Sequence, residues 1–349
     1  MATMHFGESL PDACASQTSS NAMGMRQAGF SVVELMVAMA LGLVLLGGVV
    51  VVVGNTSRSH ADLERVSRQI ENARYALKTI TDDLRHAGFY SEYYGYTVPA
   101  SAPNPCTVFT STNVSNLKGD LGLPIQGYAG ASSAPINCLS NYQANTDVVV
   151  IRRLSTAPTA GGALVANDVY AQAVANQIVL GMGNQTSNFT LKKKDGSVAE
   201  YRKVIIRLYY VRSCSDCSGS GDGIPTLARA ELSGGAFVST PIAEGIENMQ
   251  LRYGRDTADA VDGSKDGSPD TLSTLPATTA EWGDVMTVEI NLLARSTEPS
   301  AGYKDAKQYT LAGGSANGGA TVGPTNDAYR RRLFTAVAVA VNPRSLRED

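Results

Sequence analysis

Residues 26–42 read RQAGFSVVELMVAMALG, an apolar run interrupted by a single acidic residue, Glu34. From Phe30 to Val53 the chain has 24 residues, and Glu34 is the only charged one. A helix of this length spans about 36 Å at 1.5 Å per residue, enough to cross a hydrocarbon core of about 30 Å. A carboxylate in hydrocarbon costs a few kcal/mol and by default marks a functional site. The stretch therefore predicts a transmembrane helix in which Glu34 has a function.

Two ordinary kinds of membrane segment leave Glu34 unexplained. A signal anchor needs no acid, and a cleaved secretory signal has an apolar region of only about 7–15 residues. If the chain is instead cut between Gly29 and Phe30, the new amine of Phe30 lies one helical turn from Glu34. In a helical array each Glu34 then faces a neighbour's amine, and a misplaced subunit leaves a buried charge unpaired. Glu34 is thus predicted to set the register of assembly.

The stretch from Arg26 to Met36 resembles the processing site of type IV prepilins and type II secretion pseudopilins, because Gly-Phe, the acid and an unbroken apolar helix occur in one register. The resemblance implies that a prepilin peptidase/methyltransferase cuts after Gly29. Phe30 then becomes the N-methylated first residue, and Glu34 is the glutamate at the fifth position of the mature chain.

Residues 1–29 are accordingly interpreted as a prepilin leader. The first 24 residues contain Glu8 and Asp12 but no Lys or Arg, which is unlike a short basic leader. A true start at Met23 or Met25 would leave the compact leaders MGMRQAG or MRQAG. The resemblance further implies a single-pass protein of the bacterial inner membrane. Residues 30–53 would lie in lipid and the rest in the periplasm, and the assembled protein would reach the cell-surface pilus.

Residues 54–88 predict an amphipathic helix that continues the membrane segment. Its apolar residues alternate between three- and four-residue spacing, which places them on one face; they are Leu63, Val66, Ile70, Ala73, Leu77, Ile80, Leu84 and Ala87. Asp82 and Asp83 fall among the charged residues of the other faces, and Gly88 supplies a stop. The stripe is long enough for a coiled-coil dimer, but its small alanines and the β-rich remainder favour packing against a sheet.

From residue 89 onward the pattern changes to that of β-strands. Seven runs between Gly-, Ser-, Pro- and Asn-rich stretches predict strands, namely residues 147–154, 177–180, 203–212, 226–232, 245–253, 285–294 and 333–341. No second helical pattern of similar strength follows. The predicted fold class is therefore α+β and pilin-like. A long N-terminal helix, transmembrane and then amphipathic, packs on an antiparallel sheet in a periplasmic domain over residues 89–349.

Several later segments resemble PilW-type minor pilins, among them ENARYALKTITDDLRHAGFY, RLYYVRS, PIAEGIENMQLRYGRD and YRRRLFTAVAVAVNPR. The resemblance implies a subunit that joins other minor pilins in a tip or priming complex and initiates assembly of the major pilin. A type II secretion minor pseudopilin of the J type shares the helix and the processing site, and it is the alternative. Residues 95–200 carry little of the resemblance, and their fold is not predicted.

The cysteines indicate an oxidising compartment. Cys14 lies in the leader, and the four that remain are an even number beyond a membrane segment, as expected for disulfides; they are Cys106, Cys138, Cys214 and Cys217. The simplest pairing joins neighbours in sequence, although sequence alone does not fix it. The CxxC at 214–217 is also typical of redox sites and of half a zinc site. A local disulfide is favoured because the motif enters a glycine-rich loop and has no second CxxC or His pair beside it.

An acidic loop is the remaining candidate ion site. Five aspartates crowd a Gly- and Ser-rich stretch, as calcium sites do, but they fall three or four residues apart, so a solvated loop is favoured; they are Asp256, Asp259, Asp262, Asp266 and Asp270. A cluster of tyrosines after the helix is either an adhesive surface or, as we favour, a packing corner; its members are Tyr90, Tyr93, Tyr94 and Tyr96.

Catalytic patterns are missing from the sequence. The three histidines are His5, His60 and His86, so the predicted β-rich domain has none for a Ser-His-Asp or Cys-His site. We expect no enzyme activity, no cofactor and no metal. The net charge of −3 and the lack of a Lys/Arg-rich block give no support to a nucleic-acid partner. A pilus-tip adhesin is the second class of function that remains.

Overall fold

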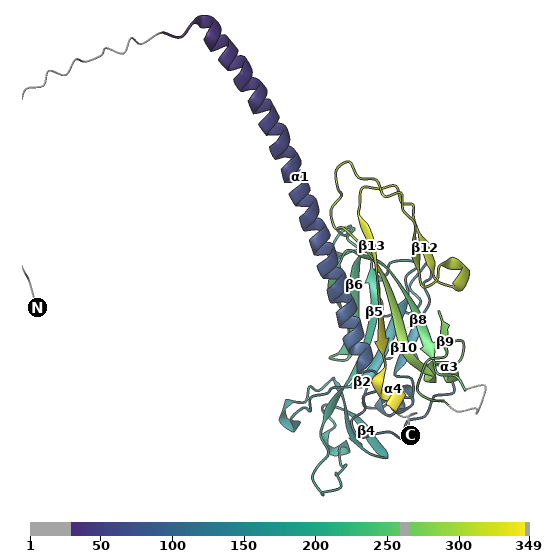
Figure 1. Cartoon of the computed structure of the whole chain (residues 1–349). Coiled ribbons are helices and arrows are strands. Elements are labelled where there is room, and N and C mark those ends of the chain that lie inside the picture. The colour runs from purple at the N-terminus through teal and green to yellow at the C-terminus, as the bar shows by residue number, and fades with distance from the viewer. Residues whose placement is uncertain (1–28, 259–264, 346–349) are drawn as a thin grey trace, which may run out of the picture. The chain divides into compact units, whose positions relative to one another are not determined.

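The computed structural model describes residues 29–258 and 265–345 (Figure 1). Helix α1, Val32–Arg85, is continuous over 54 residues. Contacts divide the chain into one compact unit that ends at Arg58 and a second that begins at Ser59. Within the described residues the first unit is helical apart from its first residues, and the second contains the rest of α1 together with the strands.

Local chemistry sets both ends of α1. Ser31 is the N-cap residue: its Oγ accepts a hydrogen bond from the Val33 N–H at 3.3 Å, which satisfies one of the unpaired amides of the first turn. The helix ends at Arg85, and Gly88, with φ of +73°, turns the chain away. A side chain at Gly88 would also meet Pro343 and Pro124 at 3.2–3.3 Å. Glycine is therefore required there for both conformation and space.

Two antiparallel sheets form most of the second unit. The larger has the order β1-β2-β5-β3-β4, and β5 also pairs with β6, which pairs with β7. These strands are β1 (Ile125–Tyr128), β2 (Val148–Leu154), β3 (Val169–Val174), β4 (Gln177–Met182), β5 (Arg202–Arg212), β6 (Thr226–Ser233) and β7 (Ala236–Glu244). The smaller has the order β13-β10-β8-β9. Its strands are β8 (Ile246–Arg255), β9 (Thr271–Ser273), β10 (Val285–Arg295) and β13 (Arg331–Val339).

Short elements connect these sheets. A two-stranded hairpin is formed by β11 (Tyr309–Leu311) and β12 (Ala320–Val322). The short α-helices are α2 (Leu117–Asp120), α3 (Thr279–Gly283) and α4 (Val341–Ser345), and the 3₁₀ turns are Val114–Asn116, Gly161–Ala163, Thr186–Asn188 and Ser315–Asn317. The C-terminal half of α1 lies across β5 and β6 of the larger sheet and β13 of the smaller one (Figure 1).

Two apolar cores lie on opposite faces of the larger sheet. Successive side chains of a strand point to opposite faces, and in β5 Tyr209 and Val211 join the core shared with α1 and the smaller sheet. Leu208 and Tyr210 join the second core, which is formed with β3, β4 and the segment after α1. Burial on both faces explains why β5 reads as an almost continuous apolar run instead of an alternating one.

The predicted helix-on-sheet fold is confirmed. Each of the seven predicted strands has a counterpart, and the helix packs on antiparallel sheet through Ala73 and Ala76, which are fully buried. Small side chains at these positions let the helix backbone approach the strands closely. Strands β1, β3, β7, β9, β11 and β12 were not predicted: β1, β9, β11 and β12 are short, β7 carries an exposed and polar pattern, and β3 was missed although it is as long as β4. Two of them, β1 and β3, belong to the region 95–200.

One detail of the helix prediction is wrong. The predicted apolar stripe begins at Leu63, but Leu63 is 64% exposed and Ile70 is half-buried. Gln69 and Asp83 are buried instead, so the buried face is rotated away from the predicted stripe. Gln69 is accommodated because its Nε2 donates to the carbonyls of Ala294, at 2.6 Å, and Arg330, at 3.0 Å. Polar side chains with fixed partners thus define this face together with the alanines.

Candidate functional site

The start of α1 brings the predicted processing and assembly residues into one short segment. Gly29 and Phe30 precede the N-cap residue Ser31, and Phe30 is 85% exposed. Glu34 lies in the first turn, where the positive end of the helix dipole favours a carboxylate. Ser31 and Glu34 also have the spacing of a capping box, in which the acid reaches back to the N-cap amide. Glu34 therefore has two chemically distinct roles open to it: capping the helix and pairing with an ammonium group.

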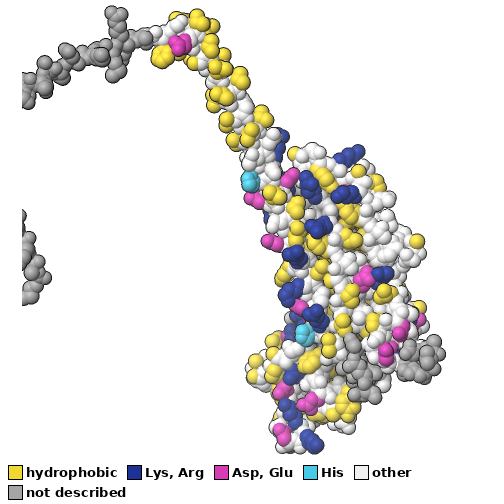
Figure 2. Space-filling view, viewed as in Figure 1, with side chains coloured by type: hydrophobic (Ala, Val, Ile, Leu, Met, Phe, Trp, Pro, Cys, Tyr) yellow, Lys and Arg dark blue, Asp and Glu magenta, His cyan; other side chains and the backbone are white. Residues whose placement is uncertain are grey.

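The apolar surface of residues 30–53 is uncovered. Its large side chains are 53–85% exposed, and the most hydrophobic 18-residue window has a mean hydropathy of 2.8 with no part of it buried. Figure 2 shows apolar side chains along this length of helix and charged ones along the part after it. By length and composition the helix can cross a membrane. A continuous apolar surface of this size requires lipid or other apolar helices around it.

The four cysteines that follow the helix form two disulfides in the structure, Cys106–Cys138 and Cys214–Cys217. The second lies in the loop between β5 and β6, where Asp222 accepts hydrogen bonds from the Ser215 and Asp216 N–H groups, both at 2.9 Å. The CxxC follows a strand and enters a turn, so it lacks the helix N-terminus that lowers the pKa of a redox thiol.

Asp83 is a polar anchor between α1 and the larger sheet. It is 5% exposed, and its Oδ1 lies 2.8 Å from Nη1 of Arg207 and 2.9 Å from Nη2 of Arg153. The Tyr209 hydroxyl donates to Oδ2 at 2.5 Å. Arg207 continues the chain of contacts to Glu231, with 2.8 Å between Nε and Oε2. Three side chains from β2 and β5 thus meet at a single carboxylate of α1.

The electrostatics keep Asp83 ionised. Burial alone would raise its pKa, but the charge of Arg207, the hydroxyl of Tyr209 and the charge of Arg153 outweigh it, and the pKa falls below the usual 3.8. Burial and the adjacent Asp83 raise the pKa of Tyr209, which stays a neutral donor. The sequence placed Asp83 among the solvated charges. The sequence does contain one sign of this contact. Arg207 is a charged residue in the middle of the apolar strand β5, and a buried guanidinium group needs an acidic partner.

A second charged cluster fixes β13. The side chain of Arg331 is 1% exposed, and Nε lies 2.5 Å from Oε2 of Glu247 in β8. Its Nη1 lies 2.6 Å from Oδ1 of Asp327 and 3.2 Å from Oδ2 of Asp305. The hydrogen bonds from Arg331 lower the pKa of Asp327 to about 2. This cluster ties the long segment after β10 to the smaller sheet, and the sequence does not reveal it because Glu247 and Asp305 are far from Arg331 in the chain.

Asp147 links the two sheets through its carboxylate, and the pKa of that carboxylate is raised. Its Oδ1 accepts from the Gly130 N–H at 2.8 Å, and Oδ2 accepts from the Leu251 N–H at 2.7 Å. Burial raises the pKa of Asp147 to about 6 despite these two hydrogen bonds. The pKa of Asp147 is higher in the folded chain than in the unfolded chain, so protonation of this group stabilises the fold. This contribution to the free energy of unfolding is complete below about pH 3.8 and is lost as the pH rises through 6.

We expect this group to make the domain about 1 kcal/mol more stable at pH 5 than at pH 7, since one pKa unit corresponds to about 1.4 kcal/mol. Asp147→Asn should lose that increment, although the amide makes one hydrogen bond fewer and lowers stability at both pH values. Urea unfolding of the full chain in maltoside detergent at both pH values measures the difference. Equal pH dependence in the variant and the wild type would contradict the assignment.

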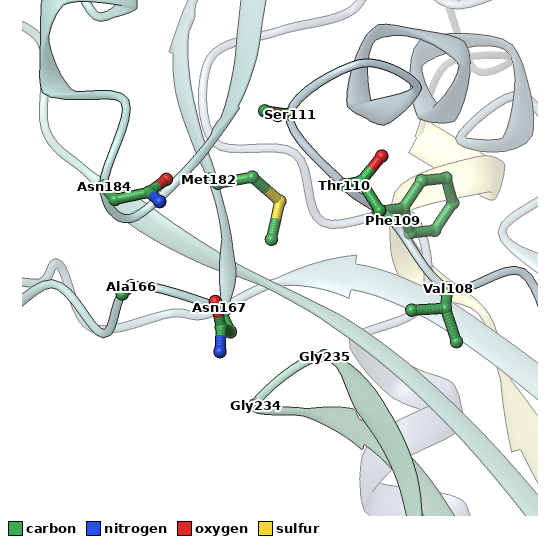
Figure 3. Close-up of a pocket in the computed structure, with 10 residues that line it drawn as sticks. All are labelled: Val108, Phe109, Thr110, Ser111, Ala166, Asn167, Met182, Asn184, Gly234 and Gly235. Carbon is green, nitrogen blue, oxygen red and sulfur yellow. The ribbon is translucent and has the colours of Figure 1, made fainter.

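A cavity of about 360 Å³ lies between the loop at residues 108–111, the end of β4 and the β6–β7 turn (Figure 3). Met182 points into it from β4, and Gly234 and Gly235 of the turn form one border. Its other lining residues are Val108, Phe109, Thr110, Ser111, Ala166, Asn167 and Asn184. None of these lining side chains is ionisable, so the cavity offers no acid, base or thiolate for catalysis.

The acidic loop lies only partly within the described residues, and Asp259 and Asp262 fall outside them. Asp256 is buried, and its Oδ2 accepts from the Gly267 N–H at 3.2 Å. Asp270 accepts from the Thr257 N–H at 2.7 Å. These carboxylates bind backbone amides of their own loop. Over residues 29–258 and 265–345, no three Asp, Glu, His or Cys side chains are grouped to hold a metal ion.

Two segments of the chain match known protein families. Residues 24–50 match the prokaryotic N-terminal methylation motif, and residues 208–342 match the family described as Type IV Pilus-assembly protein W, or PilW. The chain therefore carries a PilW domain and a prepilin-type methylation motif. The PilW match runs from the end of β5 to α4 and includes the smaller sheet, whereas the cavity of Figure 3 lies mostly outside it.

Among solved structures, a type IV-like pilin from Thermus thermophilus is similar, with a TM-score of 0.36 and 14% sequence identity. The alignment covers 79% of this chain and 97% of that one. No curated protein matches the chain. The methylation motif before an apolar helix and the PilW domain in the C-terminal half are features of a structural protein and not of a known enzyme.

Proposed function

We propose that this protein is a minor pilin of a type IV pilus. It is held in the bacterial inner membrane by residues 30–53, with its β-rich domain in the periplasm, and it is then incorporated with other minor pilins into a tip or priming complex. That complex initiates assembly of the major pilin. The observation that carries the proposal is the presence in one chain of the PilW match, the methylation motif and the uncovered apolar helix that the motif precedes.

The proposed mechanism begins with a cut between Gly29 and Phe30 by a prepilin peptidase/methyltransferase. The cut converts the Phe30 amide nitrogen into an ammonium group one helical turn from Glu34. In lipid the two charges of one subunit partly compensate each other. In the filament Glu34 pairs with the ammonium of a neighbour, and only the correct register avoids an unpaired buried charge. The exposed apolar surface then exchanges lipid for neighbouring helices.

The proposal predicts a defined N-terminus, which is the first measurement to make. Mass spectrometry of the protein from cells should find a chain that begins at Phe30 and is heavier by one methyl group. Gly29→Val should accumulate the uncut chain because a branched side chain replaces hydrogen at the scissile bond, and Ala28→Ser is the matched control. A wild-type chain that keeps residues 25–29 in a strain with active peptidase would contradict the proposal.

The alternative is a J-type minor pseudopilin of a type II secretion system, which would use the same helix and processing chemistry. The PilW match over residues 208–342 supports the pilus. Deletion of the protein separates the two: loss of surface pili and twitching supports the minor pilin, and retention of secreted enzymes in the periplasm supports the pseudopilin.

A further inference from the structure

A pocket lined by tyrosine lies where the chain turns from α1 into the β-rich domain. Its volume is about 210 Å³, and four of its eight lining residues are tyrosines; the eight are Gly88, Tyr90, Ser91, Glu92, Tyr93, Tyr94, Tyr96 and Asn342. Tyr90 and Tyr93 are 1% and 4% exposed, whereas Tyr94 is 60% exposed. The tyrosine cluster is therefore a packing corner on its inner side and an open surface on its outer side.

The pocket is held in place before any ligand arrives. The Tyr90 hydroxyl donates to the Leu121 carbonyl at 2.6 Å, and the Tyr93 hydroxyl donates to the Gly95 carbonyl at 2.5 Å. The Tyr94 N–H donates to the Ala175 carbonyl at 3.2 Å. A non-glycine residue with positive φ costs free energy and persists only where its surroundings fix it, often at a binding site. Ser91, with φ of +61°, is such a residue at the pocket wall.

The pocket combines aromatic rings with a single ionisable acid, Glu92. The rings of Tyr90 and Tyr96 are 5.2 Å apart between centroids and nearly perpendicular, at 84°; those of Tyr93 and Tyr96 are 6.5 Å apart and tilted by 52°. The rings in the pocket lining thus have different orientations. Two of the hydroxyls are already bonded to backbone carbonyls. Aromatic faces carry the negative lobe of the ring quadrupole and attract cations.

The charged residues around the pocket also favour a cation as the ligand. Glu92 is exposed and forms no ion pair within the described residues, and the lining contains no Lys, Arg or His. The buried Arg152 lies near Tyr90 but is not a lining residue. Its guanidinium donates instead to the Leu123 carbonyl at 2.9 Å and to Gln126 Oε1 at 2.8 Å. A cation in the pocket would meet one carboxylate and a lining rich in tyrosine, of which Tyr94 is the most exposed.

We propose that this pocket binds a quaternary ammonium group of the choline type. Such a cation has no N–H to satisfy, so it suits a site that offers ring faces; aromatic cages recognise this class of ligand. A primary ammonium such as a lysine side chain is strongly hydrated, so it loses more hydration free energy on entering a site walled by rings than a quaternary ammonium does. The proposal is independent of the processing and assembly of the protein.

The test is a saturation-transfer NMR titration of the full chain in dodecyl maltoside, which contains no ammonium group. Choline should bind saturably and at least 10-fold more tightly than 3,3-dimethylbutan-1-ol, its uncharged isostere. Glu92→Gln and Tyr94→Leu should each weaken binding by about 3- to 10-fold, and Tyr94→Phe should keep it within about twofold because the ring face remains. Both positions are exposed, so these variants are expected to fold.

Two arms of the titration identify the source of the ligand. Phosphocholine binding as tightly as choline would indicate a lipid-type head group, and weaker phosphocholine binding would indicate free choline; either outcome supports the proposal. Equal binding of the uncharged isostere, tighter binding of n-butylammonium than of choline, or unchanged binding by Glu92→Gln and Tyr94→Leu would overturn it.

Discussion

Glu34→Val is expected to leave the protein in the inner membrane and to reduce its incorporation into filaments by about 100-fold or more. Removing one partner of a buried ion pair costs about 3–5 kcal/mol, because the other charge stays buried and unpaired. Each 1.4 kcal/mol corresponds to a factor of ten. Valine is more compatible with lipid than glutamate is, so insertion should not suffer. The expected defect is therefore confined to assembly.

The measurement compares the variant in sheared pili with the variant in the membrane fraction by immunoblot. Met36→Leu is a matched control because it changes an exposed side chain of the same helix without changing charge. The N-terminal mass of each variant must also be measured, so that a failure of cleavage is not mistaken for a failure of assembly. Wild-type incorporation of Glu34→Val would leave a simple membrane tether as the better description.

Glu34→Gln separates the two roles that the structure leaves open for this residue. Glutamine fits a capping box with Ser31 as glutamate does, so the start of the helix is preserved. It carries no charge, so it cannot pair with an ammonium group. Loss of incorporation in both Glu34→Gln and Glu34→Val would identify the charge as the requirement. Assembly of the glutamine variant alone would assign Glu34 to helix capping.

The sequence predicts the fold well where one physical pattern dominates. Burial of apolar side chains produces the apolar run, the three-and-four spacing of α1 and the central strands of the sheets. Val149 in β2 and Tyr209 in β5 are examples. The short strands β1, β9, β11 and β12 have at most four residues each, so they contain too few positions to show a period. Their place depends on partners far away in the chain.

The polar interior could not be predicted in the same way. Asp83 and Arg331 have the composition of surface residues, and nothing in their neighbourhood shows that a carboxylate or guanidinium from another element will meet them. Apolar burial needs only a pattern, whereas a buried charge needs a specific partner. The rotation of α1 follows from this difference, because Gln69 and Asp83 are buried by partners that the helical period does not reveal.

Asp83→Asn is expected to destabilise the β-rich domain by about 3–5 kcal/mol. In a largely buried site, the amide leaves the guanidinium group of Arg153 without its carboxylate partner and that of Arg207 with Glu231 alone. For a domain of this size the thermal midpoint should fall by roughly 10 °C. Thermal unfolding of the full chain in maltoside, followed by far-UV circular dichroism, measures the shift.

Asp82→Asn is the matched control, one residue away on the same helix. Asp82 forms an exposed pair with Lys78, with 2.5 Å between Nζ and Oδ2, and exposed pairs of this spacing contribute about 0.3–0.5 kcal/mol. The same chemical change should therefore have about a tenth of the effect. Equal shifts in the two variants would show that helix charge, and not the buried contact, determines stability here.

The pH dependence of stability in Asp83→Asn tests directly whether the destabilisation is electrostatic. The pKa of Asp83 is lower in the folded than in the unfolded chain, so its contribution is present above about pH 3.8 and is lost as the pH falls through the folded value. The gap in stability between wild type and Asp83→Asn should then be constant from pH 8 to 5 and close in acid. Removing Arg153 as well, as Arg153→Met, should recover part of the loss at neutral pH, because the guanidinium group that lost its carboxylate partner is gone. A stability difference that persists in acid would show that Asp83 stabilises the domain by packing and not through its ion pairs.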